Sequence, residues 1–406
     1  MDTKVRSVFM CKAEKIRTAA IILSLVIFAG CQTTYKEDKQ QMKAKWQKDT
    51  SRIKLSAAKD QFEAGQYEQA EAVAKECIAA GLNLSDAHLL LGKAKLVEGN
   101  FSEAKSNFQT YLRLESKSAE GWFLLAMACE RLDDKASALN WYLKAIELSP
   151  GNADYIIALG RMYVSQGDFV SAENLYKGKI ATSAGSVDLK IAAAQMYLAW
   201  GQNDKAVQLY EQAQMTMPDN AELLEALGSC YILAGNWAKA GDAHKQLYQQ
   251  CTDNTVKKGY LKIMALCATN AGDYSSAMKY YSTLTSGDKD NAWLWVSMGQ
   301  AALGADLPRQ ALICSKKAIA LKNDMLEAYL LSGSANYKSG NYRQAIDDFQ
   351  KAVSNNSHAH FAWLMTARCY EKMGNAEQAK AAYEKAAKFG TDNELQKLLV
   401  KSNQES

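Results

Sequence analysis

An alanine returns at a fixed interval of 34 residues through most of this 406-residue chain. It stands at Ala70, Ala104, Ala138, Ala172, Ala206 and Ala240 and, after one step of 37 residues, at Ala277, Ala311, Ala345 and Ala379. A period of this length is typical of chains built from stacked repeats, in which each unit buries its apolar face against its neighbours. The period therefore predicts one continuous array of ten units rather than two or three globular domains.

Most of these alanines follow a turn signal made of a glycine, a polar residue and an aromatic residue. The glycines of this signal are Gly65, Gly99, Gly167, Gly235, Gly272 and Gly340. Glycine adopts the left-handed conformation that ends a helix, and an Asn or Asp after it accepts hydrogen bonds from the first N–H groups of the next helix. Each unit is therefore predicted to be a pair of helices with the alanine on the second. The turns at Asp133 and Asp306 lack the glycine.

Aromatic residues recur on both helices of the predicted pair. Four residues after the alanine, on the same face of the second helix, stand Phe108, Tyr142, Tyr176, Tyr210, Tyr281, Phe349 and Tyr383. The first helix carries Trp122 with Leu125, Leu159-Gly160 with Tyr163, and Leu227-Gly228 with Tyr231. Together these residues resemble the tetratricopeptide repeat (TPR) signature, Trp-x2-Leu-Gly-x2-Tyr, then Ala-x3-Phe, then Pro. Only Pro150 and Pro218 occupy the last position.

The resemblance implies an all-α fold, a right-handed superhelical solenoid of about ten helix-turn-helix repeats over residues 51–391. Residues 392–406 are expected to form a C-terminal capping helix or tail, because Leu395, Leu398 and Leu399 stand there among charged residues. The three extra residues of the single long step fall within residues 248–255, which leaves two alternatives: a longer loop, or a slight break between the sixth and seventh repeats.

Residues 1–30 have the pattern of a bacterial lipoprotein signal peptide. Basic residues precede an apolar run over residues 19–28, which is too short to span a membrane as a stable helix. The run ends at Ala29-Gly30-Cys31, which resembles a lipobox and implies cleavage before Cys31 and lipidation of that cysteine. A simple cleaved signal and an uncleaved anchor are the alternatives. The implied location is the bacterial cell envelope, with the lipid in the outer membrane and the repeats facing the periplasm.

Residues 31–50 are polar and rich in Lys and Gln, which leaves open a flexible tether or a helix leading into the first repeat. Residues 1–30 hold five Lys or Arg and two Asp or Glu, so their removal takes the net charge from +4 to about +1. This balance gives no argument for a nucleic-acid partner.

Residues that could carry chemistry are few. The chain has no phosphate-binding glycine loop, no HExxH, CxxC or GxSxG pattern, and only four histidines. His358 and His360 lack a third neighbouring ligand, so a surface pair is favoured over a metal site. His244 takes the aromatic position of the sixth repeat and is expected to pack. We therefore predict no catalytic residue, no cofactor, no metal and no small-molecule substrate, and the chain is not expected to be an enzyme.

The cysteines after Cys31 number seven, so they cannot form a fully paired disulfide framework. Cys230, Cys267 and Cys369 share one repeat position, just before the signature tyrosine. We expect them to be buried thiols that replace alanine.

The TPR resemblance also indicates which surface would bind a partner. In TPR proteins the first helices line a concave groove, and the fifth and ninth repeat positions commonly contact a ligand. The fifth positions that are apolar here are Leu55, Leu89, Phe123, Ile157, Ile191, Val296, Leu330 and Leu364, with polar breaks at Glu225 and Lys262. An exposed apolar strip would favour a partner, whereas burial between neighbouring helices is the alternative.

Basic ninth positions near the N-terminal end, Lys59, Lys93 and Arg161, are expected to attract an acidic segment of the partner. Acidic second positions, such as Asp86, Glu120 and Asp154, lie in the first helical turn, where the helix dipole already explains them.

These features favour a non-enzymatic scaffold for other proteins, a membrane-anchored lipoprotein that serves in assembly of a secretion, pilus, outer-membrane or polysaccharide-export complex. Its groove would capture an apolar peptide segment of a partner. A regulator of cell-wall polymer hydrolysis, or an unrecognised hydrolase, is the alternative, which would need a catalytic constellation among residues used for helix packing.

Overall fold

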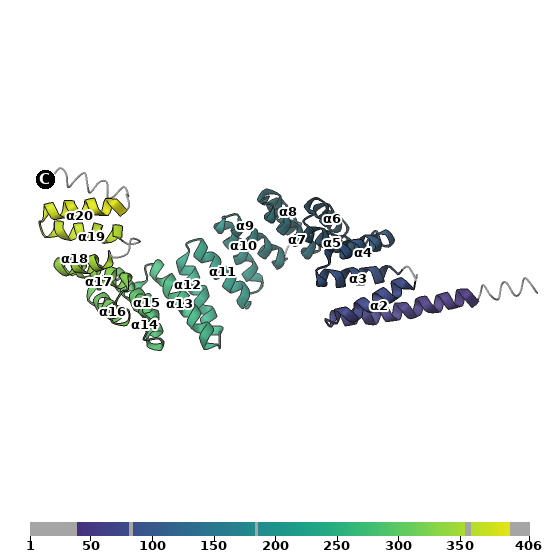
Figure 1. The fold of residues 1–406 in the computed structure, drawn as a ribbon, viewed down its shortest axis with the longest axis horizontal. Helices are drawn as coiled ribbons and strands as arrows, with labels where there is room; N and C mark the ends of the chain where they lie inside the picture. Colours follow the sequence, from purple (N-terminus) through teal and green to yellow (C-terminus); the bar gives the residue numbers. More distant parts are fainter. Residues whose placement is uncertain (1–38, 81–83, 183–185, 354–358, 390–406) are drawn as a thin grey trace, which may run out of the picture. The chain divides into compact units, whose positions relative to one another are not determined.

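The computed structural model describes residues 39–80, 84–182, 186–353 and 359–389. Within these ranges the chain consists of helices joined by short turns and contains no strand, as the 34-residue period predicts (Figure 1). The chain divides between Asp168 and Phe169 into two compact units. The predicted signal peptide, Cys31 and the C-terminal cap lie outside the described residues.

Each predicted repeat contains two helices, here called A and B. The first A helix covers residues 39–63 and is called the leading helix. The later A helices are α3 (Ser85–Glu98), α5 (Ala119–Arg131), α7 (Ala153–Ser165), α9 (Val187–Ala199), α11 (Ala221–Leu233), α13 (Asn254–Asn270), α15 (Ala292–Gly304), α17 (Leu326–Lys338) and α19 (Ala359–Lys372). The B helices are α2 (Tyr67–Ala79), α4 (Phe101–Leu114), α6 (Lys135–Leu148), α8 (Phe169–Thr182), α10 (Asn203–Thr216), α12 (Trp237–Gln250), α14 (Tyr274–Gly287), α16 (Pro308–Leu321), α18 (Tyr342–Ala352) and α20 (Ala376–Phe389).

The turn between A and B helices has the predicted chemistry. Gly99 ends α3 in the left-handed conformation at φ 81°, and the side chain of Asn100 accepts a hydrogen bond from the backbone N–H of Glu103 in α4. In the two turns without glycine, Asp133 and Asp306 adopt the same conformation, at φ 58° and 59°. The local geometry is therefore kept even where the residue best suited to it is absent.

The recurring alanines and aromatic residues form the packing between the helices of a repeat. All ten alanines are buried. In the second repeat, Phe108 of α4 is fully buried beside Gly92 of α3, and a methyl group on that glycine would lie 2.5 Å from the ring. Gly333 and Phe349 form the equivalent pair in the ninth repeat. The absence of a side chain at Gly92 thus leaves room for the ring that the period places opposite it.

Within each unit, successive helices pack against one another along the chain, from α2 to α7 in the first unit and from α8 to α20 in the second. A helices of neighbouring repeats also contact each other, as α3 does α5 and α17 does α19. Their outward residues therefore form a shared face.

The extra residues before the seventh repeat lengthen a helix. Only residues 251–253 separate α12 from α13, and α13 has 17 residues where the other A helices after the leading helix have 13 or 14. Asp253 caps it by accepting hydrogen bonds from the backbone N–H groups of Thr255 and Val256. The expectation of a longer loop is thus wrong, and α12 packs on α13 without a break.

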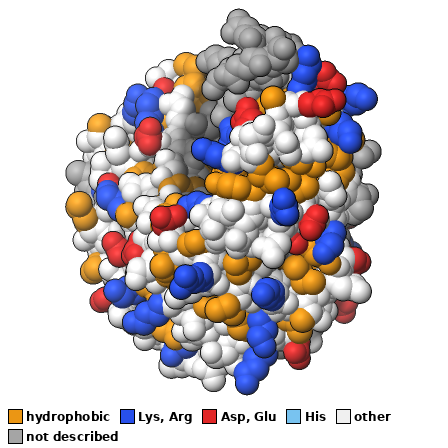
Figure 2. All heavy atoms as spheres, turned by 90° about the vertical axis from the view of Figure 1, so that its left-hand side faces the viewer, with side chains coloured by type: hydrophobic (Ala, Val, Ile, Leu, Met, Phe, Trp, Pro, Cys, Tyr) orange, Lys and Arg blue, Asp and Glu red, His pale blue; other side chains and the backbone are white. Residues whose placement is uncertain are grey.

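The surface around α19 and α20 mixes both signs of charge with apolar side chains, and no large area of one sign is seen there (Figure 2). Among the described residues, no helix has both the length and the apolar content needed to cross a bilayer.

Candidate partner-binding groove

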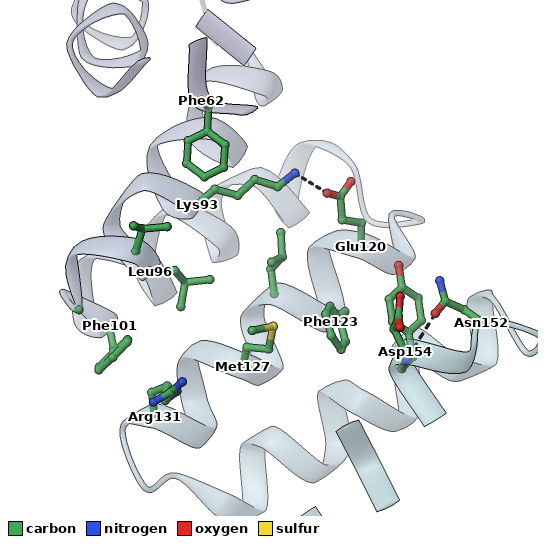
Figure 3. A pocket seen from close by; sticks show the side chains of 14 residues that line it. Phe62, Lys93, Leu96, Phe101, Glu120, Phe123, Met127, Arg131, Asn152 and Asp154 are labelled. Carbon is green, nitrogen blue, oxygen red and sulfur yellow. Dashed lines mark hydrogen bonds and ion pairs between the residues drawn. The ribbon is translucent and has the colours of Figure 1, made fainter. Parts of the chain in front are cut away.

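A groove of about 800 Å³ lies on the face of the A helices in the first unit (Figure 3). Side chains from the leading helix, α3, α5 and α7 enter it, together with the turn that begins α4. Its lining residues are Phe62, Lys93, Leu96, Val97, Gly99, Phe101, Glu120, Phe123, Leu124, Met127, Arg131, Asn152, Asp154 and Tyr155. Cavities of about 410 and 460 Å³ in the second unit are smaller.

The helical repeat explains why α5 contributes most of the floor of the groove. Phe123, Met127 and Arg131 are spaced by four residues, so they lie on one face of α5 over two turns. The first two occupy the fifth and ninth repeat positions that the TPR resemblance assigned to a ligand. Each is half-buried, so part of each side chain is open to the groove.

Aromatic rings form one wall of the groove. Phe123 stacks on Tyr155 with their ring centres 4.6 Å apart and also touches Tyr142, at 5.7 Å. Burial raises the pKa of Tyr155, and the nearby carboxylates of Glu120 and Asp154 raise it further. The phenol therefore stays protonated at neutral pH and presents a hydrogen-bond donor beside an apolar ring.

The charged residues of the groove are arranged in pairs between neighbouring repeats. Lys93 of α3 lies 2.5 Å from a carboxylate oxygen of Glu120 on α5. One repeat earlier, Lys59 lies 3.2 Å from Asp86. Each pair joins the ninth position of one repeat to the second position of the next, because adjacent A helices bring these positions together.

These pairs modify the sequence interpretation of both positions. The second-position acids were assigned to the helix dipole alone, whereas Asp86 and Glu120 each also neutralise a lysine. The two ion pairs could have been predicted from the sequence, because the spacing from Lys59 to Asp86 and from Lys93 to Glu120 is 27 residues in both. Two of the three basic residues expected to attract an acidic segment thus already have acidic neighbours. The third, Arg161, is exposed.

The eight apolar fifth positions divide into two groups. Leu55, Leu89, Val296 and Leu364 are buried in the packing between helices. Phe123, Ile157, Ile191 and Leu330 are half-buried, and the polar breaks Glu225 and Lys262 are exposed. Buried positions therefore interrupt the apolar strip. Phe123 is the fifth-position residue that lines the groove.

The histidines and cysteines that the structure describes have surroundings that indicate packing roles. His244 is buried, with Nδ1 2.8 Å from the carbonyl oxygen of Ala240 in the preceding turn of α12. His360 lies 3.2 Å from the carbonyl of Ala386, while His358 falls outside the described residues. The described part of the chain contains no group of three His, Cys, Asp or Glu placed to hold a metal ion. Cys230, Cys267 and Cys369 are fully buried, as predicted.

Comparison with known proteins identifies the repeats. Family models described as tetratricopeptide repeat match residues 89–153, 156–186, 197–247 and 336–401. The chain belongs to the tetratricopeptide repeat family. TPR proteins bind other proteins, and the repeats make this chain a protein-interaction scaffold.

Individual relatives of this TPR chain match over limited lengths. Protein STIP1 homolog from Dictyostelium discoideum is 32% identical over 94 residues, which are 23% of this chain and 17% of that protein. The chain therefore spans less than a fifth of that relative.

Several solved structures match parts of the chain at low TM-scores. MamA is 25% identical over 43% of this chain and 95% of its own, with a TM-score of 0.37. A TPR protein from Parabacteroides merdae covers 71% of this chain and 99% of its own, at 16% identity and a TM-score of 0.42. PilW, a type IV pilus biogenesis factor, covers 50% of this chain and 93% of its own, at 21% identity and a TM-score of 0.43.

Proposed function

We propose that this TPR chain is a lipid-anchored scaffold of the bacterial cell envelope that holds an apolar segment of a partner protein in the groove of its first unit. The supporting observation is the open groove itself, where half-buried Phe123, Leu124 and Met127 lie next to the paired charges of Lys93 and Glu120. Apolar side chains that remain partly open in a concave site favour an occupant that covers them.

The chemistry of the groove suits an apolar side chain flanked by polar backbone. An aliphatic or aromatic residue inserted beside Phe123 and Tyr155 would remove apolar surface from water, which contributes about 1.5–3 kcal/mol for a fully buried side chain. Polar groups at the rim, including the Tyr155 hydroxyl and the Asp154 carboxylate, are available for the partner's backbone N–H and C=O groups. The occupant is accordingly a peptide segment.

The proposed anchor rests on the sequence of residues 1–31. An apolar run that ends in Ala29-Gly30-Cys31 supports cleavage and lipidation at Cys31. The lipid would hold the repeats at the outer membrane and raise the local concentration of the groove near its partner.

Substitution in the groove tests the first part of the proposal. A photo-crosslinking residue at position 127 should capture a partner in cells, and Phe123→Asp should weaken that capture about 30-fold, as expected for loss of a central anchor. Leu143→Asp is the matched control, because Leu143 lies in the same repeat, is 46% exposed and does not line the groove. Equal capture by both Asp variants, with unchanged circular dichroism, would reject the groove as the binding site.

Fractionation tests the anchor. The native chain is expected in the membrane fraction, and Cys31→Ala is expected to shift most of it to the soluble fraction. If both chains still distribute alike after a high-salt wash that removes electrostatically bound protein, lipidation of Cys31 is wrong.

A further inference from the structure

The first turns of the leading helix bury no side chain. Residues 39–49, for which the sequence left a tether and a helix open, are helical, and every one of them is exposed. Packing of the first repeat uses only the later part of this helix, where Leu55 and Ala58 are buried. In Figure 1 the purple end of the helix extends beyond α2. A helix of this length that contacts no neighbour gains nothing from tertiary packing.

This exposed part has one apolar stripe. Met42, Trp46 and Ile53 are 71%, 69% and 72% exposed, respectively. Their spacings of four and seven residues place them on one face of the helix, and Leu55 and Ala58 lie on the opposite face. The side turned away from the repeat therefore presents a large aromatic ring and two long apolar side chains to solvent.

Lys39, Lys43, Lys45 and Arg52 flank the stripe, whereas Lys48 lies towards the face of Leu55. Lys39, Lys43, Lys45, Lys48 and Arg52 have no acidic partner among the described residues, whereas Lys54 is bonded to Glu76 at 2.6 Å. Asp49 is the single acid between residues 39 and 54. From residue 55 onward the chain has 36 Lys and Arg against 39 Asp and Glu. The positive charge of the mature chain is thus concentrated on this one helix.

We propose that residues 39–54 of the leading helix lie on the surface of a membrane that contains anionic phospholipid. The apolar stripe would insert at the level of the headgroups, with Trp46 at the interface, and the flanking lysines would extend to lipid phosphates. A phosphate polymer such as nucleic acid would attract the lysines equally but would leave the apolar stripe uncovered. The combination of stripe and flanking charge therefore favours a lipid surface.

This inference deepens the proposed anchoring. The described part of the helix starts eight residues after Cys31, so a lipid on that cysteine would hold it next to the bilayer. Stable attachment generally needs two signals, such as an acyl chain and a basic surface. The helix supplies the second signal, and it would orient the first repeat relative to the membrane.

Vesicle binding by the unlipidated mature chain tests the proposal apart from lipidation. The chain from residue 31 onward with Cys31→Ala is mixed with vesicles of phosphatidylcholine alone, or of phosphatidylcholine with phosphatidylglycerol, and sedimented. Binding is expected only with phosphatidylglycerol and should weaken at high salt. Changing Lys39, Lys43 and Lys45 together to Gln should weaken it about 100-fold, since each basic residue near an anionic surface contributes about 1 kcal/mol.

Matched variants separate this helix from general effects of charge and aromatic content. Trp46→Gln should reduce binding, whereas Trp293→Gln should not, although Trp293 is 55% exposed. Likewise, changing exposed Lys316, Lys317 and Lys322 to Gln should leave binding unchanged. Circular dichroism confirms that each variant keeps its helices.

Three results would overturn the inference: equal binding to both kinds of vesicle, equal loss in test and control variants, or binding to duplex DNA that matches vesicle binding and is insensitive to Trp46→Gln. If Cys31→Ala does not change how the chain fractionates, vesicle binding by this helix is still expected. The two proposals can therefore fail separately.

Discussion

The hydroxyl of Tyr197 on α9 donates a 2.7 Å hydrogen bond to the carboxylate of Glu173 on α8. The same carboxylate oxygen lies 2.8 Å from the ammonium of Lys177 and 3.3 Å from that of Lys205 on α10. Lys205 also sits 5.1 Å from the centre of the Tyr197 ring. The signature tyrosine of one repeat is thereby tied to the B helix of the repeat before it.

The next repeat contains the same arrangement. Tyr231 donates to Glu211 at 2.7 Å, and Lys239 lies 2.8 Å from that carboxylate and 5.4 Å from the tyrosine ring. The tyrosine thus stabilises the stacking of repeats through its hydroxyl, in addition to packing through its ring.

Removing the Tyr197 hydroxyl should weaken this stacking. Tyr197→Phe is expected to lower the free energy of unfolding by about 1 kcal/mol, because the half-buried carboxylate of Glu173 loses a hydrogen bond. A double-mutant cycle with Glu173→Gln should give a coupling energy of similar size. Tyr370→Phe, at the same position of the tenth repeat, is the control. Equal effects of the two phenylalanine variants would show that the Glu173 contact contributes nothing.

Stability should fall in acid because of Glu173. Hydrogen bonds from Lys177 and Tyr197 lower the pKa of this carboxyl from 4.5 to about 2. A group whose pKa is depressed in the folded state stabilises the fold above its unfolded pKa, and that contribution is lost as the pH falls from about 4.5 towards 2. Urea unfolding of Glu173→Gln should therefore show less dependence on pH in this range. A parallel dependence in both chains would exclude Glu173 as the source.

Two glycine substitutions should have opposite effects on the free energy of unfolding. Gly333→Ala should destabilise the chain by about 1–3 kcal/mol, since the new methyl group would lie 2.7 Å from the ring of buried Phe349. Gly259→Ala in α13 meets no atom within 4 Å and should stabilise by about 0.5–1 kcal/mol through helix propensity. Thermal unfolding of the two variants checks this. Destabilisation by both would mean that space around Gly333 is not the cause.

The turn after α5 should accept glycine. Asp133 holds φ at 58°, a conformation that costs an L-residue about 1 kcal/mol, and its pair with Lys135 is exposed and contributes little. Asp133→Gly should therefore raise the free energy of unfolding by about 1 kcal/mol. Asp133→Ala removes the carboxylate but keeps the strain, so it should give no gain. A gain from alanine would attribute the effect to charge.

Thiol reactivity should single out Cys251. Burial raises the pKa of Cys314 to about 11 and that of Cys369 to about 12, and Cys251 is the one half-buried thiol among the seven after Cys31. Since the thiolate is the reactive form, an alkylating reagent should modify Cys251 quickly in the native chain from residue 31 with Cys31→Ala, and the other six only on unfolding. Rapid modification of Cys369 would contradict the packing of α19.

The repeat pattern predicted most of the fold because each signature residue reports a local requirement. Gly99 marks a turn that needs positive φ, and Phe108 faces Gly92 because their helices are adjacent in the chain. The pairing of Lys93 with Glu120 was missed, because neither residue belongs to the signature and their meeting depends on how successive A helices align. The extra residues before Lys258 gave no local sign that they would lengthen α13.

From the sequence alone, the helix pairs, their turns and the buried alanines follow, since a 34-residue period can be satisfied only by repeating the same short-range packing. The tertiary structure decided which fifth-position side chains stay open. Leu55 and Phe123 occupy equivalent positions, yet Leu55 is buried and Phe123 lines the groove. Exposure depends on the size of the residues contributed by the neighbouring helices, and that information lies in no single repeat.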